Sequence, residues 1–171
     1  MDMWYVIQTL GGEEERAANM IRRQIPHYYM EECFVPKRER MKKFHGSWNK
    51  VEEILFRGYV FVASQTPERL YQELKKIPKL TKMLGREKDI YFPLNELEER
   101  MVRGIGDKEH KTVLSKIEID EGKQIRVTEG PLKDYVRNVV RVNLHKREVA
   151  VQVKFMGKTV ELFMGVELVN E

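Results

Sequence analysis

The side chains best suited to chemistry in this sequence are basic, and they gather in the last third of the chain. Residues 133–158 contain seven lysines and arginines against two acidic residues, Asp134 and Glu148. Such side chains neutralise phosphates, and arginine also donates paired hydrogen bonds to guanine or stacks on an unpaired base. The cluster predicts RNA contact, with solvated strand faces as the alternative. The candidate RNA-binding residues are Lys133, Arg137, Arg141, His145, Lys146, Arg147, Lys154 and Lys158.

Within this cluster, residues 143–147 are short, polar and basic. A-form RNA hides its major groove, so a protein that reads sequence generally needs a loop, a bulge or a distorted helix. A loop of this size and charge suits insertion at such a site. A solvated hairpin turn is the other interpretation.

A second basic cluster occurs earlier in the chain, where the pattern predicts a long, charged hairpin. Residues 33–44 are expected to be extended, 46–49 to form the tip, and 50–55 to return. The hairpin predicts a second surface for a polyanion, unless its charges are only solvated. Its basic residues are Lys37, Arg38, Arg40, Lys42, Lys43 and Lys50.

Motifs for catalysis are not found in the sequence. The four histidines are far apart and lack paired metal-ligand spacing. The single cysteine, Cys33, has no surrounding motif, which favours a small buried hydrophobe over a nucleophile. Gly11 and Gly12 follow the first predicted strand without the further glycines or lysine of a phosphate-binding loop. We therefore expect a protein that is not an enzyme, with no metal and no cofactor.

Length and composition fit a globular protein of one domain or two small ones. The chain has 171 residues, 42% hydrophobic and 34% charged, with a net charge of +4. No apolar run approaches the roughly 20 residues that span a bilayer, and the first residues carry no basic signal region. We expect a cytoplasmic monomer that does not contact membranes, and a lone cysteine excludes an internal disulfide.

The first hundred residues predict strands and helices in one α+β layer arrangement. Strands are expected at 4–9 and 56–62, with Tyr59 and Phe61 on one face and Val60 and Val62 on the other. Helices are expected at 13–24, from Pro67 to a stop at Pro78, and at 96–102, where Asn95 and Glu98 suit a capping box. A brief extended piece is expected at 90–93.

After residue 104 the pattern changes. Glycines and charges at 105–116 predict a linker. Beyond it Val149, Val151, Val153 and Phe155 alternate with other residues, and turns are spaced for five short strands with no helix. The predicted domains are therefore 1–104, an α/β sandwich with a mixed sheet, flanking helices and a projecting hairpin, and 117–171, a small β-barrel.

Several segments together resemble the NusG superfamily. Residues 4–9, 34–36 and 55–62 are similar to the signature segments of the NusG N-terminal (NGN) domain, and 122–142 with 155–158 are similar to a KOW motif. Within that superfamily the chain is most similar to the LoaP antiterminators. Two positions depart from the pattern: Arg137 stands where glycine is usual, and Arg57 where proline is common.

The resemblance implies a processive antitermination factor. The N-terminal domain would bind the β′ clamp helices of RNA polymerase, and the KOW domain a hairpin in a leader transcript. For the basic hairpin at 37–50, contact with upstream DNA and simple exposure both stay open. The candidate polymerase-binding residues are Tyr5, Phe34, Phe56, Tyr59 and Phe61, of which at least one or two are expected to be ordinary core residues.

Two other interpretations are consistent with the resemblance. A general elongation factor would use the barrel for protein partners such as Rho or ribosomal protein S10. A ribosomal or other KOW protein would use it for RNA alone, although the complete N-terminal domain argues against this.

Overall fold

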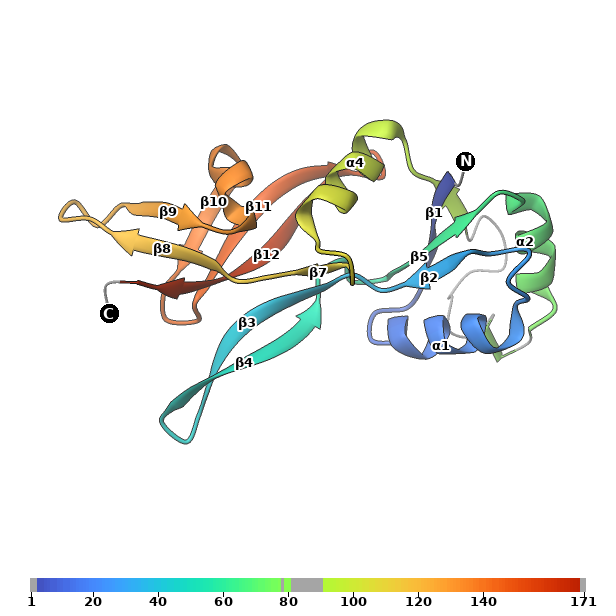
Figure 1. The fold of residues 1–171 in the computed structure, drawn as a ribbon, viewed down its shortest axis with the longest axis horizontal. Coiled ribbons are helices and arrows are strands. Elements are labelled where there is room, and N and C mark those ends of the chain that lie inside the picture. The colour runs from blue at the N-terminus through green and yellow to red at the C-terminus, as the bar shows by residue number, and fades with distance from the viewer. Residues whose placement is uncertain (1–2, 78, 81–90, 170–171) are drawn as a thin grey trace. The chain divides into compact units, whose positions relative to one another are not determined.

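The computed structural model describes residues 3–77, 79–80 and 91–169, and it divides into two compact units. The N-terminal unit contains residues 1–35 and 56–100, and the C-terminal unit contains 36–55 and 101–171. Figure 1 shows the elements of both. The predicted hairpin is therefore grouped with the C-terminal strands. The domain limits 1–104, 105–116 and 117–171 stay a prediction.

A four-stranded sheet forms the centre of the N-terminal unit. Its order is β2 (Glu32–Phe34), β5 (Tyr59–Ser64), β1 (Met3–Gln8) and β6 (Tyr91–Pro93). All three pairings are antiparallel, so the described sheet is not the mixed sheet that the sequence predicted. Strands β1 and β2 run parallel to each other and are connected through a helix. They do not pair, because β5 lies between them and runs opposite to both.

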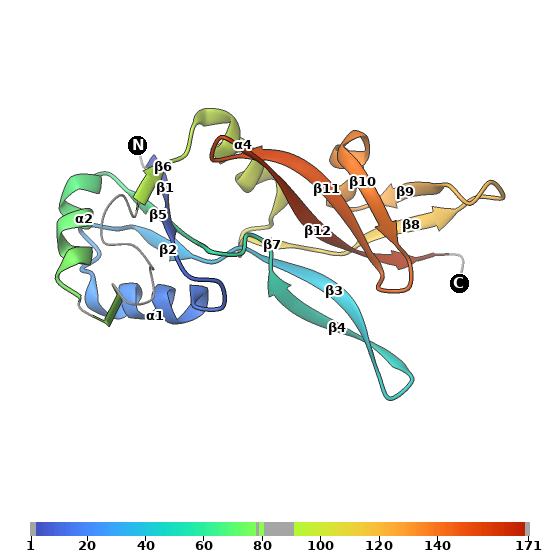
Figure 2. The same cartoon turned by 180° about the vertical axis from the view of Figure 1, so that it is seen from behind.

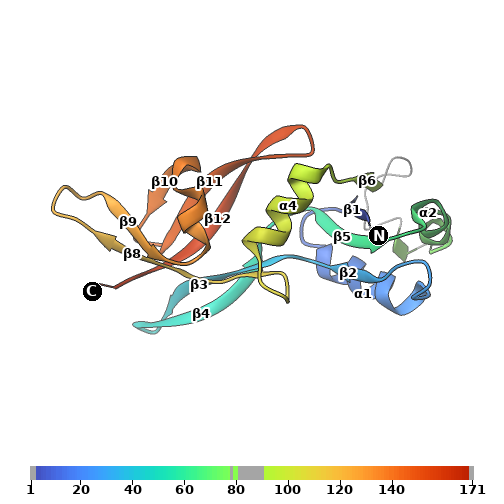
Figure 3. The same cartoon turned by 45° about the horizontal axis from the view of Figure 1, so that its top comes forward.

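Helices cover this sheet as their apolar faces require. Helix α1 (Glu14–Gln24) buries Ala17, Ala18 and Ile21, and α2 (Pro67–Lys75) buries Leu70 and Leu74. Figures 1 and 3 show α1 alongside β2 and β5. Thr66 precedes α2 as predicted but makes no side-chain cap. Pro78, expected to end this helix, and Ile90 lie outside the described residues.

The predicted capping box is confirmed in α4 (Glu96–Ile105). Asn95 Oδ1 accepts from the Glu98 backbone N–H at 2.8 Å, and Glu98 Oε1 accepts from the Asn95 N–H at 2.9 Å. The two bonds satisfy donors that a helix start leaves unpaired. The helix continues past Val102, where the sequence predicted its end.

Glu14 has a structural role that the sequence did not indicate. Its carboxylate is fully buried and accepts from the backbone N–H groups of Gly12 and Gly58, each at 2.8 Å. Gly58 needs its positive φ of 87° at this turn. The neighbouring Arg57 lies against Gly11, where a Cβ would be 2.8 Å from the guanidinium Nε. An arginine therefore fits the position where proline is common.

The long hairpin, which we call the arm, begins the C-terminal unit. Strands β3 (Lys37–Phe44) and β4 (Ser47–Ile54) pair along their whole length, and β7 (Lys111–Thr112) joins β3 in parallel. His45 and Gly46 form the tip, both with positive φ, as a two-residue hairpin turn requires. The tip is thus shorter than the predicted 46–49, and Trp48 lies in β4. Figure 2 shows the arm as a two-stranded ribbon.

Five strands form the other sheet of this unit, in the order β10 (Val139–Asn143), β11 (Glu148–Phe155), β12 (Lys158–Leu168), β8 (Ser115–Ile119) and β9 (Ile125–Glu129). The predicted alternation is confirmed: Val149, Val151, Val153 and Phe155 are buried, while Gln152 and Lys154 are exposed. Ile117, Leu132 and Met164 complete this core. Segment 105–116, expected to be a linker, contains β7 and the start of β8.

A short helix interrupts these strands, contrary to the expectation of none. The 3₁₀ helix η1 (Pro131–Asn138) connects β9 to β10, and Figure 3 shows it beside β10 and β11. Arg137 is exposed in its last turn, and its φ is not positive. The backbone at this position therefore has no need of glycine, and the side chain is presented at the surface.

Strand β12 packs directly against β3 of the arm, and a glycine makes this possible. A Cβ on Gly165 would meet the Glu39 carbonyl oxygen and lie 2.8 Å from Arg40 Cα. Only hydrogen at this position lets the two backbones approach so closely. The arm thus packs on the five-stranded sheet of the same unit.

Candidate nucleic-acid interface

The basic residues nearest the base of the arm are neutralised by carboxylates. Arg38 is buried and forms ion pairs with Glu148 at 2.9 Å and Glu53 at 3.4 Å. Arg40 pairs with Glu53 at 2.9 Å. Buried charges need such partners. The pairs with Glu53 join β3 to β4 within the arm, and the pair with Glu148 holds the arm against β11. They are therefore structural, although the sequence grouped them with the polyanion-binding candidates.

Towards the tip the cations lie at the surface. Lys42 and Lys43 are exposed, and no carboxylate among the described residues forms an ion pair with either. Lys43 is paired across the strands with Trp48, and its ammonium lies 5.7 Å from the ring centroid of Trp48. Lysine and tryptophan side chains thus share one face of the arm.

The predicted loop 143–147 is the turn between β10 and β11, and we call it the basic turn. The Lys146 backbone N–H donates to Asn143 Oδ1 at 3.0 Å, and the Arg147 N–H to the Leu144 carbonyl at 3.2 Å. Arg147 adopts a positive φ of 54°. These bonds fix the backbone and leave His145 and Lys146 exposed.

The structure brings the basic turn and the arm together. The Arg147 guanidinium lies 4.9 Å from the centroid of Trp48, within cation–π range, and Arg40 donates to the Lys146 carbonyl at 3.4 Å. Figures 1 and 2 show the β10–β11 turn on the side of the unit from which the arm extends. Between them lies a groove of about 260 Å³, the arm groove, lined by Arg40, Met41, Lys42, Lys43, Trp48, His145 and Lys146.

The remaining RNA-binding candidates do not join this groove. Arg141 is exposed but its guanidinium binds Glu161, with Nη1 3.0 Å from Oε1. Lys154 and Lys158 flank the opposite end of β11. At about 3.4 Å per residue that strand separates them from the basic turn by on the order of 20 Å. Lys133 and Arg137 are exposed on η1.

A second hollow, of about 500 Å³, lies behind the basic turn. It is partly apolar, since Val142, Leu144, Ala150 and Phe163 contribute to its lining. Phe163 is 37% exposed, and Arg38 lies 5.6 Å from its ring centre. An exposed aromatic ring at such a hollow suits an apolar side chain of another protein.

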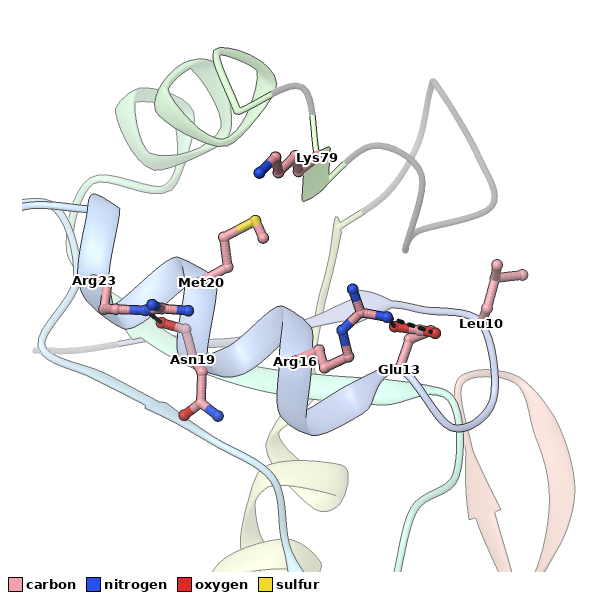
Figure 4. Close-up of a pocket in the computed structure, with 7 residues that line it drawn as sticks. All are labelled: Leu10, Glu13, Arg16, Asn19, Met20, Arg23 and Lys79. Atoms are coloured by element: carbon pink, nitrogen blue, oxygen red, sulfur yellow. Dashed lines mark hydrogen bonds and ion pairs between the residues drawn. The ribbon is translucent and has the colours of Figure 1, made fainter.

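A third hollow lies in the N-terminal unit, and its lining is less suited to binding a ligand. It measures about 510 Å³ and lies along α1, where Figure 4 shows the seven lining residues. Two of the basic side chains that line it have partners within the protein. Arg16 forms an ion pair with Glu13 at 3.0 Å, and Arg23 donates to the Asn19 carbonyl at 3.4 Å. The hollow has no convergent set of polar groups that would orient a ligand.

Catalytic and metal chemistry find no support in the described residues. Cys33 is buried, and this burial raises the pKa of its thiol to about 12, so the thiol stays protonated. Within the described ranges, no three His, Cys, Asp or Glu side chains are grouped to hold a metal ion. No described helix is long and apolar enough to cross a membrane.

Comparison with known proteins places the chain in a family. The family model described as "Transcription termination factor nusG" matches residues 2–105. The chain belongs to the NusG family. The transcription termination/antitermination protein NusG of Pasteurella multocida is 31% identical over 98% of this chain and 95% of its own length. That of Haemophilus influenzae is 29% identical over 95% and 91%.

The fold agrees with this membership. A solved structure described as "Domain interaction in Thermotoga maritima NusG" superposes with a TM-score of 0.55 at 20% identity, covering 96% of this chain and 94% of that one. The chain is thus a NusG-type transcription termination/antitermination factor. NusG proteins are transcription factors and not enzymes, as the sequence predicted.

Four of the five aromatic residues proposed for polymerase binding are core residues of this NusG-family chain. Tyr5, Phe34, Phe56 and Phe61 are at most 6% exposed. Phe61 stacks on Phe34 at 5.4 Å and contacts Phe56 at the same distance. Tyr59 is partly exposed. This agrees with the expectation that at least one or two of the five are ordinary core residues, and Tyr59 is the most accessible member of the set.

Trp48 is the residue of the interface that the sequence did not single out. It was expected in the tip of the hairpin, where its ring would have no fixed neighbours. The available signal was Trp48 two positions before Lys50, which puts both on one face of a strand, because aromatic and basic side chains on one face are typical of nucleic-acid surfaces.

Proposed function

We propose that this NusG-family chain is a specialised antitermination factor of the LoaP type. It binds RNA polymerase through its N-terminal domain and a hairpin of a leader transcript through its KOW domain. The observation that carries the proposal is the basic turn: His145 and Lys146 are exposed on a backbone fixed by two hydrogen bonds. Preorganised cations at a narrow turn suit the distorted or unpaired parts of an RNA hairpin.

The polymerase contact is proposed for the β′ clamp helices and the N-terminal domain. Tyr59, partly exposed at the start of β5, is the candidate anchor, and the buried aromatic residues support the strand that carries it. A protein that bridges the clamp disfavours the opened, paused polymerase. The factor would then act by shifting the populations of two polymerase states.

The proposed organisation follows the sequence: 1–104 as the polymerase-binding domain, 105–116 as linker and 117–171 as KOW domain. A monomer is proposed, because each function needs one copy of its surface. The LoaP assignment is supported by the surface exposure of Arg137, the arginine at the usual glycine position.

The RNA part is tested with the full chain and a pool of RNA hairpins that share a stem and vary in the loop. Repeated binding and elution should enrich a defined loop, and the enriched hairpin should bind much more tightly than a scrambled one. Lys146→Gln should weaken this binding. Recovery of an unenriched pool would contradict the proposal.

The polymerase part is tested by capture of purified RNA polymerase on immobilised full-length protein. Tyr59→Ala should reduce capture, because truncating an aromatic anchor usually costs more than about 1 kcal/mol. Tyr28→Ala is the control, since Tyr28 is 75% exposed on a different segment. Equal capture by wild type and Tyr59→Ala would contradict the proposed anchor.

A general NusG-type elongation factor whose KOW domain binds proteins is the second candidate. The hollow beside Phe163 favours it, because an exposed aromatic ring at a partly apolar hollow suits an apolar side chain of another protein. The same RNA selection separates the two candidates, since a general factor needs no loop preference.

A further inference from the structure

We infer that the arm and the basic turn together form one binding site for an unpaired nucleotide of an RNA hairpin, in which Trp48 stacks on the base. The inference rests on the proposed function and extends it to residues of the arm. It gives the arm an RNA ligand, where the sequence left open both contact with upstream DNA and simple exposure.

The first support is the composition of the arm groove. Its walls combine one indole ring, the thioether of Met41 and cations from both segments. Proteins that bind single-stranded nucleic acid use this combination: aromatic rings stack on bases, and a basic groove follows the phosphates. Duplex DNA offers no free base face, so an indole in the groove favours an unpaired nucleotide.

The second support is the distribution of charge. The arginines at the base of the arm are engaged by Glu53 and Glu148, whereas Lys42, Lys43 and Lys146 form no ion pair with a described carboxylate. Three cations that form no ion pair with a described carboxylate therefore line the groove, and each can neutralise a phosphate. The volume of about 260 Å³ is small for a drug-sized ligand and suits a single base.

The third support is that the groove is already assembled. The Arg38–Glu148 ion pair and the close packing of Gly165 on β3 fix the arm against the C-terminal sheet. Arg147 contacts Trp48 at 4.9 Å and holds the ring. Lys43 is exposed and lies near the limit of cation–π range at 5.7 Å, so its ammonium can move to a phosphate when a base stacks.

The test uses full-length protein and the individual hairpin recovered from the randomised-loop pool. Trp48→Ala should weaken its binding about tenfold, the typical loss for one stacked base, while Trp48→Phe should retain most of it. Because Trp48 lies at the surface of a paired strand, circular dichroism should show both variants folded. Tyr28→Ala is the matched control and should bind like the wild type.

Lysine variants test the phosphate contacts. Lys42→Gln and Lys43→Gln should each weaken binding and lower the slope of log affinity against log salt by about 0.7, the value for one phosphate of a single strand. Lys123→Gln is the charge-matched control in the β8–β9 turn, outside the groove. An unchanged slope in both arm variants would overturn the role of the arm.

A double-mutant cycle tests whether the two segments form one site. Trp48→Ala and Lys146→Gln should together weaken binding less than the product of their single losses, because they contact the same nucleotide. Losses that multiply fully would indicate two independent contacts and overturn the inference. A DNA hairpin of the same sequence, or a blunt DNA duplex, that competes as well as the RNA would overturn the assignment to RNA.

Failure of the inference is distinguishable from failure of the proposed function. If the wild type selects a hairpin and Trp48→Ala binds it equally well, the KOW domain reads RNA without the arm, and only the inference is wrong. If the wild type selects no hairpin, both are wrong.

Discussion

Arg38 Nη1 lies 2.9 Å from Glu148 Oε2, and this buried ion pair joins two strands whose residues are 110 positions apart in the chain. Arg38 has a second carboxylate, Glu53, at 3.4 Å, whereas the only ion pair found for Glu148 among the described residues is with Arg38. Loss of Arg38 leaves Glu148 without a counter-charge, whereas loss of Glu148 leaves Arg38 paired with Glu53. The two losses should therefore destabilise the protein to different degrees.

Arg38→Met should reduce the free energy of unfolding by about 3–5 kcal/mol, because it leaves the Glu148 carboxylate buried without a counter-charge. Glu148→Gln should cost less, since Arg38 keeps Glu53. Urea unfolding followed by circular dichroism measures both. The double variant Arg38→Met/Glu148→Leu should recover much of the loss, and equal losses in the two single variants would contradict this description.

Gly165→Ala should destabilise the C-terminal unit by at least about 2 kcal/mol, because the added methyl group meets the backbone of β3, which has no room to move. Gly104→Ala is the matched control. It lies in α4 with nothing within 4 Å of the new Cβ, so it should be neutral or stabilising by up to about 1 kcal/mol. Thermal unfolding compares the two, and similar midpoints for both variants would refute the close packing.

The ion pairs that join the two strands of the arm should weaken in acid. Burial raises the pKa of Glu53, but the hydrogen bond from Arg40 and the charges of Arg38, Arg40 and Lys42 lower it more, so the pKa lies below the usual 4.5. A lowered folded-state pKa gives stability that is complete above about pH 4.5 and is lost as the pH falls through the folded value. Glu53→Gln should lower stability at pH 7 and flatten its dependence on pH between about 5 and 3. An unchanged slope would contradict the ion pairs.

Cys33 should resist alkylation in the folded protein. Burial raises the pKa of the thiol to about 12, so the reactive thiolate is scarce at pH 8. Iodoacetamide should modify the native chain slowly and the urea-unfolded chain fast, as mass spectrometry would show. Rapid modification of the native protein would mean that the strand β2 opens readily.

Local patterns predicted much of the fold. The Asn95–Glu98 capping box, the face assignment of Tyr59 and Phe61, and the alternation along 149–155 follow from rules that act over a few residues. The tip of the arm was misplaced because His45 is an uncommon residue at a positive φ. The 3₁₀ helix was missed because Pro131–Asn138 has only Leu132 as a buried residue.

The sequence predicted the basic residues of the candidate interface but not how they are arranged. Both basic clusters were predicted from the sequence. Their proximity in the fold depends on long-range contacts, namely the packing of β12 on β3 and the Arg38–Glu148 ion pair. No local pattern indicates which arginine will find a carboxylate 110 positions away. The ion pairs of Arg38 and Arg40, the lack of a described ion pair at Lys42 and Lys43, and the place of Trp48 between Lys43 and Arg147 therefore needed the structure.

Fluorescence of Trp48 during titration with the selected RNA hairpin shows whether a base stacks on this ring. Trp4 is only 3% exposed, so the change on adding RNA should come from Trp48. The account predicts saturable quenching at the same RNA concentration that saturates binding, and its loss in Trp48→Phe. Tight RNA binding that leaves the Trp48 emission unchanged would contradict it.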